Sequence, residues 1–360
     1  MKKRYYLLIG GLILVVIIAA IAYFMTKKAV SPAESSLTEL NLEKVTGEKI
    51  EAINLLEKNR YNFAEISANE LAFLGTEPSL FKYELPDKKQ LEKYDLPEEL
   101  ANSEIEQVQF NANLTVAAVK PLNENRLGIF KLDGSFKKQI ILKQDLIGFN
   151  WLNSEELIIA TGTEGEIKIS TQKSPYEAET VIITLKESAT SIDFLPVREN
   201  KVAVLTSVPD EGNQNYYLVD LKKKSSQILI KNCFPVSQDA KDNQAAVSYL
   251  DENDQALMKI FDTGGNEVDS VELPQKGKTI KWTGSGKGIL IGFGGAEGED
   301  DKLALYSLES KKLKEIIMPK SRPDFLETVT ISRILSSNQN AITFDDNGLL
   351  FNLYLKDDLL

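Results

Sequence analysis

The stretch Ser154–Ser170, SEELIIATGTEGEIKIS, contains two short apolar strands joined by a polar turn. The same arrangement occurs seven times in the chain. The first strands of these hairpins start near Leu71, Val116, Leu157, Val202, Ala245, Ile289 and Ala341. The steps between these positions are 45, 41, 45, 43, 44 and 52 residues. A repeat of about 40–45 residues built only of strands is typical of β-propeller blades. The sequence therefore predicts an all-β, seven-bladed β-propeller, with six and eight blades as alternatives.

Further strands flank each hairpin, so that each repeat has three or four. An apolar or aromatic segment precedes several of them, as in Phe149–Trp151 and Ile280–Trp282, and a Lys- or Ser-rich strand follows. Two stretches deviate from the pattern. Residues 95–104 are expected to carry a helical turn, and Pro319 and Pro323 predict a loop within 317–328.

The last repeat lacks a strand, because only five residues follow Leu355. A closed ring needs its last blade completed, so an early strand must supply the missing one. In the segment 37–44, Leu40 and Leu42 alternate with polar residues, as in a half-buried strand. We therefore expect 37–44 to close the ring and remove an exposed sheet edge.

The N-terminal segment Tyr5–Met25 contains 21 residues without a charge. As a helix it would be about 31 Å long, which matches the hydrocarbon core of a bilayer. More positive charge precedes this segment than follows it, which places the N-terminus in the cytoplasm. A cleaved signal peptide ending near Ala20–Ala22 is the alternative, but its apolar region would usually be shorter.

These observations divide the chain into three parts. Residues 1–28 are the cytoplasmic tip and transmembrane helix, 29–36 a linker, and 37–360 a propeller outside the cytoplasm. The expected location is the cell membrane, with a single pass. Without the five basic residues of 1–28, the remainder has 37 basic and 53 acidic residues, a net charge of −16. Such a surface repels nucleic acid, so no nucleic-acid partner is expected.

Composition argues against the common catalytic machineries. The chain has no histidine, which excludes Ser-His-Asp and Cys-His arrangements and the commonest zinc ligand. The single cysteine, Cys233, cannot form an internal disulfide and is expected to be a small buried residue. No enzymatic activity is predicted, with a carboxylate-based glycoside hydrolase as the alternative.

Acidic residues gather in the turns of four predicted hairpins, at 210–213, 251–254, 297–301 and 345–348. None has the spacing of an EF-hand, and Asp, Asn and Gly are favoured in turns anyway. We expect no cofactor and no metal, with calcium in these loops as the alternative. The tips 208–214 and 295–302 are expected to protrude most, and their candidate partner-contact residues are Asp210, Glu211, Asn213, Glu297, Glu299, Asp300 and Asp301.

Two repeats, FNWLNSEELIIA (149–160) and IKWTGSGKGILI (280–291), carry a family resemblance. The chain resembles the TolB-like and WD-repeat-like β-propellers of bacterial envelopes, over about residues 63–357. The Ser-Pro-Asp-Gly turn of that family is present only in degraded forms such as Val236–Asp239, and the GH and WD dipeptides are absent. The resemblance implies the fold, while function must come from a site.

These observations favour a membrane-anchored, non-enzymatic propeller that binds another envelope protein through exposed loops. The alternative is a propeller that binds or cleaves glycans of the cell wall.

Overall fold

A computed structural model describes residues 42–53, 63–67, 70–74, 79–84, 89–133, 137–163, 165–198, 200–207, 214–338, 340–347 and 349–355. These residues belong to one compact unit, Glu43–Leu360, apart from Leu42. The expected membrane segment Tyr5–Met25 lies outside the described residues. Within the part of the chain that is described, no helix is long and apolar enough to cross a membrane.

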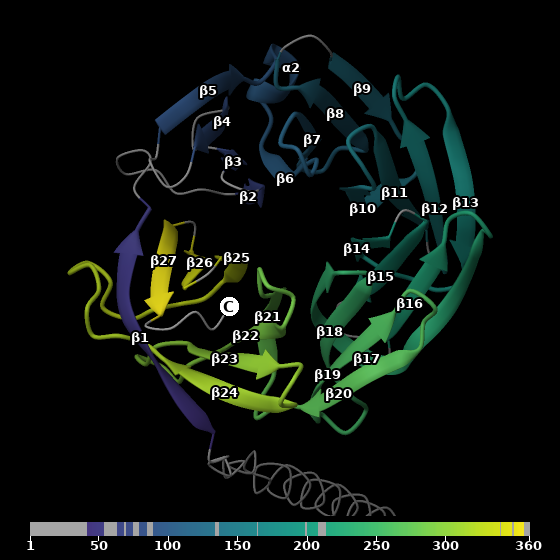
Figure 1. Cartoon of the computed structure of the whole chain (residues 1–360). Helices are drawn as coiled ribbons and strands as arrows, with labels where there is room; N and C mark the ends of the chain where they lie inside the picture. The colour runs from purple at the N-terminus through teal and green to yellow at the C-terminus, as the bar shows by residue number, and fades with distance from the viewer. Residues whose placement is uncertain are drawn as a thin grey trace, which may run out of the picture. The chain divides into compact units, whose positions relative to one another are not determined.

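The described unit is built of antiparallel strands in repeated groups (Figure 1). Its only helix among the described residues is the four-residue α2, Glu98–Ala101, which confirms the helical turn expected within 95–104. Three groups are separate four-stranded sheets: β2 (Phe63–Ser67), β3 (Glu70–Leu74), β4 (Ser79–Glu84) and β5 (Lys89–Asp95); β6 (Ile105–Phe110), β7 (Val116–Pro121), β8 (Arg126–Lys131) and β9 (Lys137–Ile141); and β10 (Asp145–Trp151), β11 (Glu156–Thr163), β12 (Glu166–Lys173) and β13 (Glu179–Leu185).

The next two groups share one long strand, β17 (Ser225–Lys241). Its first part pairs with β16 and its second part with β18, which makes a seven-stranded sheet. The strands of this sheet are β14 (Ser191–Arg198), β15 (Lys201–Ser207), β16 (Gln214–Asp220), β17, β18 (Gln244–Leu250), β19 (Ala256–Asp262) and β20 (Glu267–Glu272). Because β17 forms backbone hydrogen bonds with strands of both groups, it fixes the position of one group relative to the other.

The last groups also share a strand, β1 (Glu43–Ala52). Together they form an eight-stranded sheet of β21 (Gly277–Trp282), β22 (Gly288–Phe293), β23 (Lys302–Ser307), β24 (Lys312–Ile317), β1, β27 (Leu349–Leu355), β26 (Ala341–Asp346) and β25 (Arg333–Asn338). The segment between β24 and β25 contains no strand, as the two prolines predict.

The first strands of successive groups contact one another around a closed circle (Figure 1). The contacts run from β2 through β6, β10, β14, β17, β21 and β25, and return to β2. The first strand of each of the seven predicted hairpins is the second strand of its group. The described unit is therefore a β-propeller, and the all-β prediction is confirmed.

The core lies between neighbouring sheets, on both faces of the second and third strands. In β22, for example, every residue is buried, so its sequence reads GILIGF rather than alternating. Separate apolar clusters fill the spaces between adjacent groups, such as the one that joins Ile158 and Ile169 to Phe194 and Val204. Burying such side chains is the main stabilising term, at about 1.5–3 kcal/mol for each large one.

The early strand β1 lies between the last two groups and pairs with both. Residues Gly47–Ala52 of β1 pair antiparallel with β27. Of the segment 37–44, residues 37–41 lie outside the described residues, while Glu43 and Lys44 pair parallel with β24 of the preceding group. The strand beside the last hairpin therefore begins after the segment that sequence alternation indicated.

Candidate interaction face

The connections between second and third strands share one side of the propeller with the segments that enter the first strands. We call this side the loop face. Its described connections include 122–125, 251–255 and 294–301. Strand β15 ends at Ser207 and strand β16 begins at Gln214. The connection 208–213 between them, with Asp210, Glu211 and Asn213, lies outside the described residues. The second predicted tip is described in full.

Two neighbouring aspartates of this tip point inward. The buried Asp301 accepts hydrogen bonds from the N–H groups of Gly295, at 2.8 Å, and Ile331, at 2.7 Å. It also forms an ion pair with Lys278 at 3.0 Å. The half-buried Asp300 pairs with Arg322 at 2.6 Å and accepts the N–H of Val329 at 2.8 Å. Both carboxylates are therefore occupied by bonds within the chain.

A third carboxylate completes this arrangement. Asp346 of β26 accepts the N–H of Thr330 at 3.1 Å. Three consecutive backbone N–H groups, of residues 329 to 331, are thus held by three different aspartates. Burial raises the pKa of Asp346 above its usual range, against the opposing effect of this N–H bond. The long loop before β25 is fastened to two hairpins of the loop face.

The two glutamates of the same tip point outward. Glu297 and Glu299 are exposed, and the turn between them is closed by the Glu299 N–H, which donates to the Ala296 carbonyl at 2.9 Å. Gly298 between them has φ +80°, a conformation that favours glycine. The tip therefore exposes two carboxylates on a backbone that the hydrogen bonds of Asp300 and Asp301 hold in place. Of the four residues predicted here, two face solvent and two do not.

The acidic turns elsewhere are stabilised by their own backbone. Asp251 accepts N–H bonds from Asn253 and Gln255, both at 2.9 Å, and Asp262 accepts them from Gly264 and Asn266. Bonds from Gln255 and Asn253 lower the pKa of Asp251. Across the described ranges, no group of three Cys, Asp or Glu side chains is arranged to hold a metal ion.

One hollow of the loop face has a volume of about 670 Å³. It spans three groups, from Glu106 and Lys120 through Asp145 to Thr190. Its charged side chains are partly paired: Lys120 and Glu106 are 2.7 Å apart, and Asn125 donates to Asp145 at 2.8 Å. No aromatic side chain is among the described residues that line it, so it offers polar contacts but no stacking platform.

Sequence reasoning missed this hollow and the contacts made by the loop that ends at Ser332. Within that loop Phe325 is 62% exposed, although its ring centroid lies 6.3 Å from that of Phe351. Pro319 and Pro323 indicated a loop, but no local signal shows that it binds carboxylates about 30 residues away. These contacts form only when the closed ring brings the loop next to the hairpin that carries the carboxylates, so neighbouring residues in the sequence do not indicate them.

Comparison with known proteins yields the fold alone. No family model matches the chain, and no curated protein matches it in sequence. Solved structures do match, 1336 chains in all, a number typical of an architecture shared by many proteins. One of them belongs to the mitotic checkpoint complex, with a TM-score of 0.57 and 14% identity over 87% of this chain and 93% of that chain. The likeness supports a WD40-like β-propeller fold.

Proposed function

We propose that this chain is a non-enzymatic scaffold that binds another protein of the cell envelope through its loop face. The observation that carries the proposal is the tip 294–301, where Asp300 and Asp301 fasten the backbone while Glu297 and Glu299 remain exposed. A tip that is already rigid loses little conformational entropy on binding. Its two carboxylates suit a partner with a basic surface.

The proposal includes seven blades, with β1 completing the last one, and a TolB-like relationship. The strand groups and the circle of contacts between first strands support this count. It also includes an uncleaved membrane anchor at Tyr5–Met25, supported by the 21 uncharged residues and the preceding basic cluster. The propeller would then lie outside the cytoplasm, close to the membrane.

The carboxylates of the loop face support binding rather than catalysis. A glycoside hydrolase needs two carboxyl groups directed at a substrate. Here Asp300, Asp301 and Asp346 accept backbone N–H groups, and Glu106 is paired with Lys120. Binding of cell-wall glycans through the hollow of the loop face is the second candidate, favoured by its hydroxyl and amide lining. A glycan array and a turnover assay with the purified chain test it.

The experiment is a pull-down from envelope extracts with the full chain in detergent. Glu297→Lys/Glu299→Lys should reduce recovery of a specific partner at least tenfold. The matched control, Glu155→Lys/Glu309→Lys, reverses two exposed glutamates in turns on the other side of the propeller. Equal recovery with both double variants would contradict the proposal that the tip binds the partner.

A further inference from the structure

The outer strand β9 has an edge that bonds to no other strand among the described residues. It is the end strand of its sheet and pairs only with β8. Leu142, just after β9, donates its N–H to the Asn125 carbonyl at 2.8 Å. Because bonded and non-bonded pairs alternate in an antiparallel ladder, Lys138 and Ile140 also bond to β8. The N–H and C=O groups of Lys137, Gln139 and Ile141 therefore point away from the sheet.

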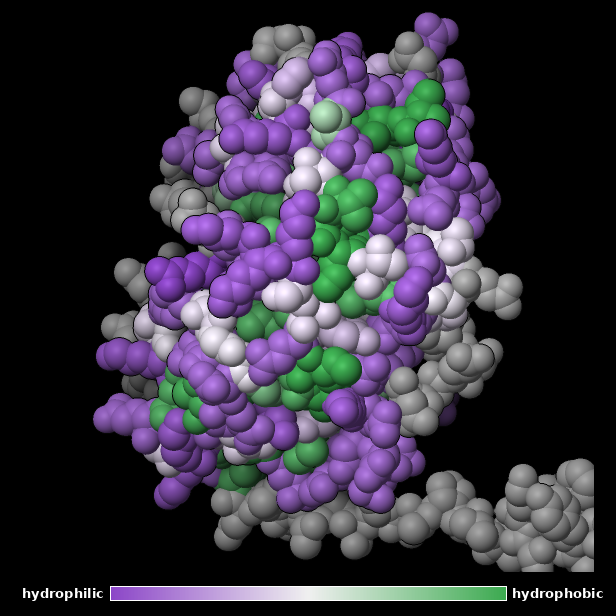
Figure 2. All heavy atoms as spheres, turned by 90° about the vertical axis from the view of Figure 1, so that its right-hand side faces the viewer, coloured by the Kyte–Doolittle hydropathy of each residue, from purple (hydrophilic) through white to green (hydrophobic). Residues whose placement is uncertain are grey.

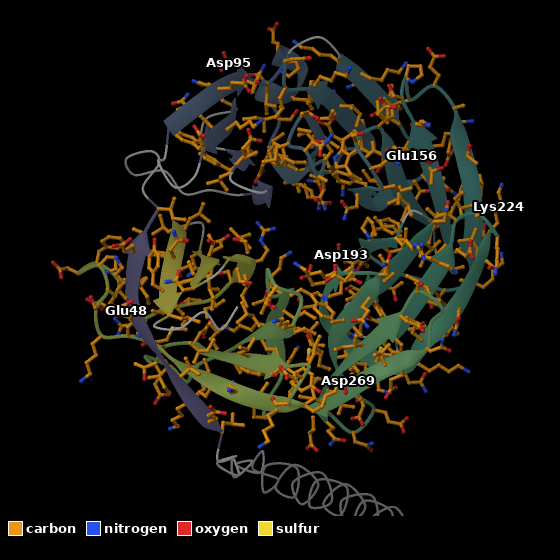
Figure 3. The ribbon with its side chains drawn as sticks, in the orientation of Figure 1. Glu48, Asp95, Glu156, Asp193, Lys224 and Asp269 are labelled. Carbon is orange, nitrogen blue, oxygen red and sulfur yellow. The ribbon has the colours of Figure 1, made fainter. Side chains whose placement is uncertain are left out.

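The outer strands β13 and β20 are each bridged by a neighbouring group. Lys224 donates to the Val181 carbonyl of β13 at 3.2 Å, and Lys311 pairs with Asp269 of β20 at 2.6 Å. Both Lys224 and Asp269 lie on the outer side of the ring (Figure 3). The outer strand β24 is paired with β1. Among the described residues, no hydrogen bond or ion pair from another group reaches residues 137–141.

The exposed side chains of the rim also set β9 apart. Figure 2 shows the rim over β13 and β17, where apolar areas lie among hydrophilic side chains. On these two strands Val181 and Ile228 are 43% and 40% exposed. Ile141 of β9 is 79% exposed, the highest value among the large apolar side chains described. Its side chain therefore lacks the cover that the sheets give to other aliphatic residues.

A small apolar pocket lies beside this edge. It has a volume of about 180 Å³ and is lined by Pro97, Leu100, Gly128 and Phe130 together with Lys137, Lys138 and Gln139. Gly128 is the cross-strand partner of Gln139, and Phe130 that of Lys137, so these residues share one face of the sheet. A Cβ at Gly128 would lie 2.5 Å from Leu100 Cδ1 and 2.8 Å from Phe130 Cζ, so the glycine allows Leu100 and Phe130 to pack close to the strand and form the apolar wall of the pocket. Cavities of about 150 Å³ accommodate a benzene-sized group.

The charge at this edge is opposite to that of the chain as a whole. Lys137 and Lys138 line the pocket, and none of its described lining residues is acidic, although the net charge of the chain is −11. Lysines on an edge strand usually oppose pairing with another copy of the same protein, which carries the same lysines. They attract an acidic strand instead.

We propose that β9 binds an extended, acidic segment of a partner protein, which adds to the sheet as a fifth strand. Backbone groups of Lys137, Gln139 and Ile141 would supply the hydrogen bonds. An aliphatic side chain of the segment, beside Gln139, would enter the pocket that Leu100 and Phe130 line. The site is separate from the tip 294–301 and does not depend on the proposed function of the loop face.

The test is selection of random nine-residue peptides displayed on phage against the full chain in detergent. We expect enrichment of acidic peptides with alternating aliphatic residues. Synthetic versions, followed by fluorescence polarisation, should bind at least tenfold more weakly to Gln139→Pro, which removes one outward N–H but no bond to β8. Gln139→Thr keeps that N–H and should bind as the wild type does.

A second pair of variants makes the outcome independent of proline. Lys137→Glu/Lys138→Glu should weaken binding at least tenfold, while Glu297→Lys/Glu299→Lys should leave it unchanged. Circular dichroism checks that each variant is folded. Failure to enrich any such peptide, or equal binding by the wild type, the lysine double variant and Gln139→Pro, would overturn the proposal. Neither result bears on the loop face.

Discussion

Trp282 donates its indole N–H to the backbone carbonyl of Asp239, which lies 3.2 Å away on the first strand of the preceding group. The Asp239 carboxylate accepts the backbone N–H of Trp282 at 2.7 Å. Trp151 repeats the first contact with the Gln109 carbonyl at 3.0 Å. These residues are 43 and 42 positions apart, about one repeat. The tryptophans of the repeat therefore join first strands of neighbouring groups.

Trp282→Phe should lower the free energy of unfolding by about 1–3 kcal/mol, because the buried Asp239 carbonyl loses a donor. Urea unfolding followed by circular dichroism measures this. Trp151→Phe should have a similar effect. The double variant should show the sum of the two within about 0.5 kcal/mol, since the two contacts share no partner. A change near zero in both single variants would show that the indole bonds do not stabilise the ring.

The recurrence of the hairpin pattern, and not of the two tryptophans alone, explains why the sequence predicts the fold. Each repeat carries its own strand pattern, and burial of second strands such as β22 produces continuous apolar runs that are easily recognised. The position of β1 was harder to predict, because alternation in 37–44 indicates a strand but not its partner. The residues of β1 that face the last group are set by the register of its pairing with β27, which no local pattern in either strand indicates.

The candidate site was less predictable than the fold, for the same reason. Asp300 and Asp301 read as turn residues, since acidic side chains are common in hairpin loops. Their inward bonds to Val329 and Ile331 depend on how the loop after β24 returns to the ring. Glu297 and Glu299 of the same tip are exposed, as acidic residues of hairpin turns usually are.

Gly47 marks the point where β1 passes from one group to the next. A Cβ there would lie 2.9 Å from both Leu353 Cδ1 and Pro319 Cδ and 3.0 Å from the Ile317 carbonyl oxygen. Gly47→Val should therefore destabilise the propeller by about 1–3 kcal/mol through overpacking. Urea unfolding checks this value. Gly294→Ala is the control, because its Cβ would meet mainly the flexible end of Lys278. Unchanged stability in both variants would show that close packing at Gly47, where β1 joins two groups, does not stabilise the propeller.

Asp346 should make stability depend on pH in an unusual direction. Burial raises its pKa in the folded state, so the folded protein binds a proton more readily than the unfolded chain. Its contribution to stability is complete below the unfolded value near 3.8 and is lost as the pH rises through the folded pKa. Asp346→Asn should remove this dependence.

The measurement is urea unfolding of the wild type and Asp346→Asn at several pH values between 3.5 and 7. The stability of the wild type relative to the variant should fall as the pH rises. Asp254→Asn, in another connection of the loop face, is measured in parallel as a matched substitution. A relative stability that rises with pH would mean that bonds to Thr330 and Asn347 outweigh burial.

The reactivity of the Cys233 thiol reports on the stability of the seam, by which we mean the point at which β17 passes from one group to the next. The thiol is fully buried where the strand passes from one group to the next, and burial raises its pKa to about 12. The thiolate is the reactive form, so an aromatic disulfide reagent at pH 8 should not modify folded protein. Modification should begin only at urea concentrations that unfold the propeller. Fast reaction in the absence of urea, with unchanged circular dichroism, would show that the seam opens locally without global unfolding.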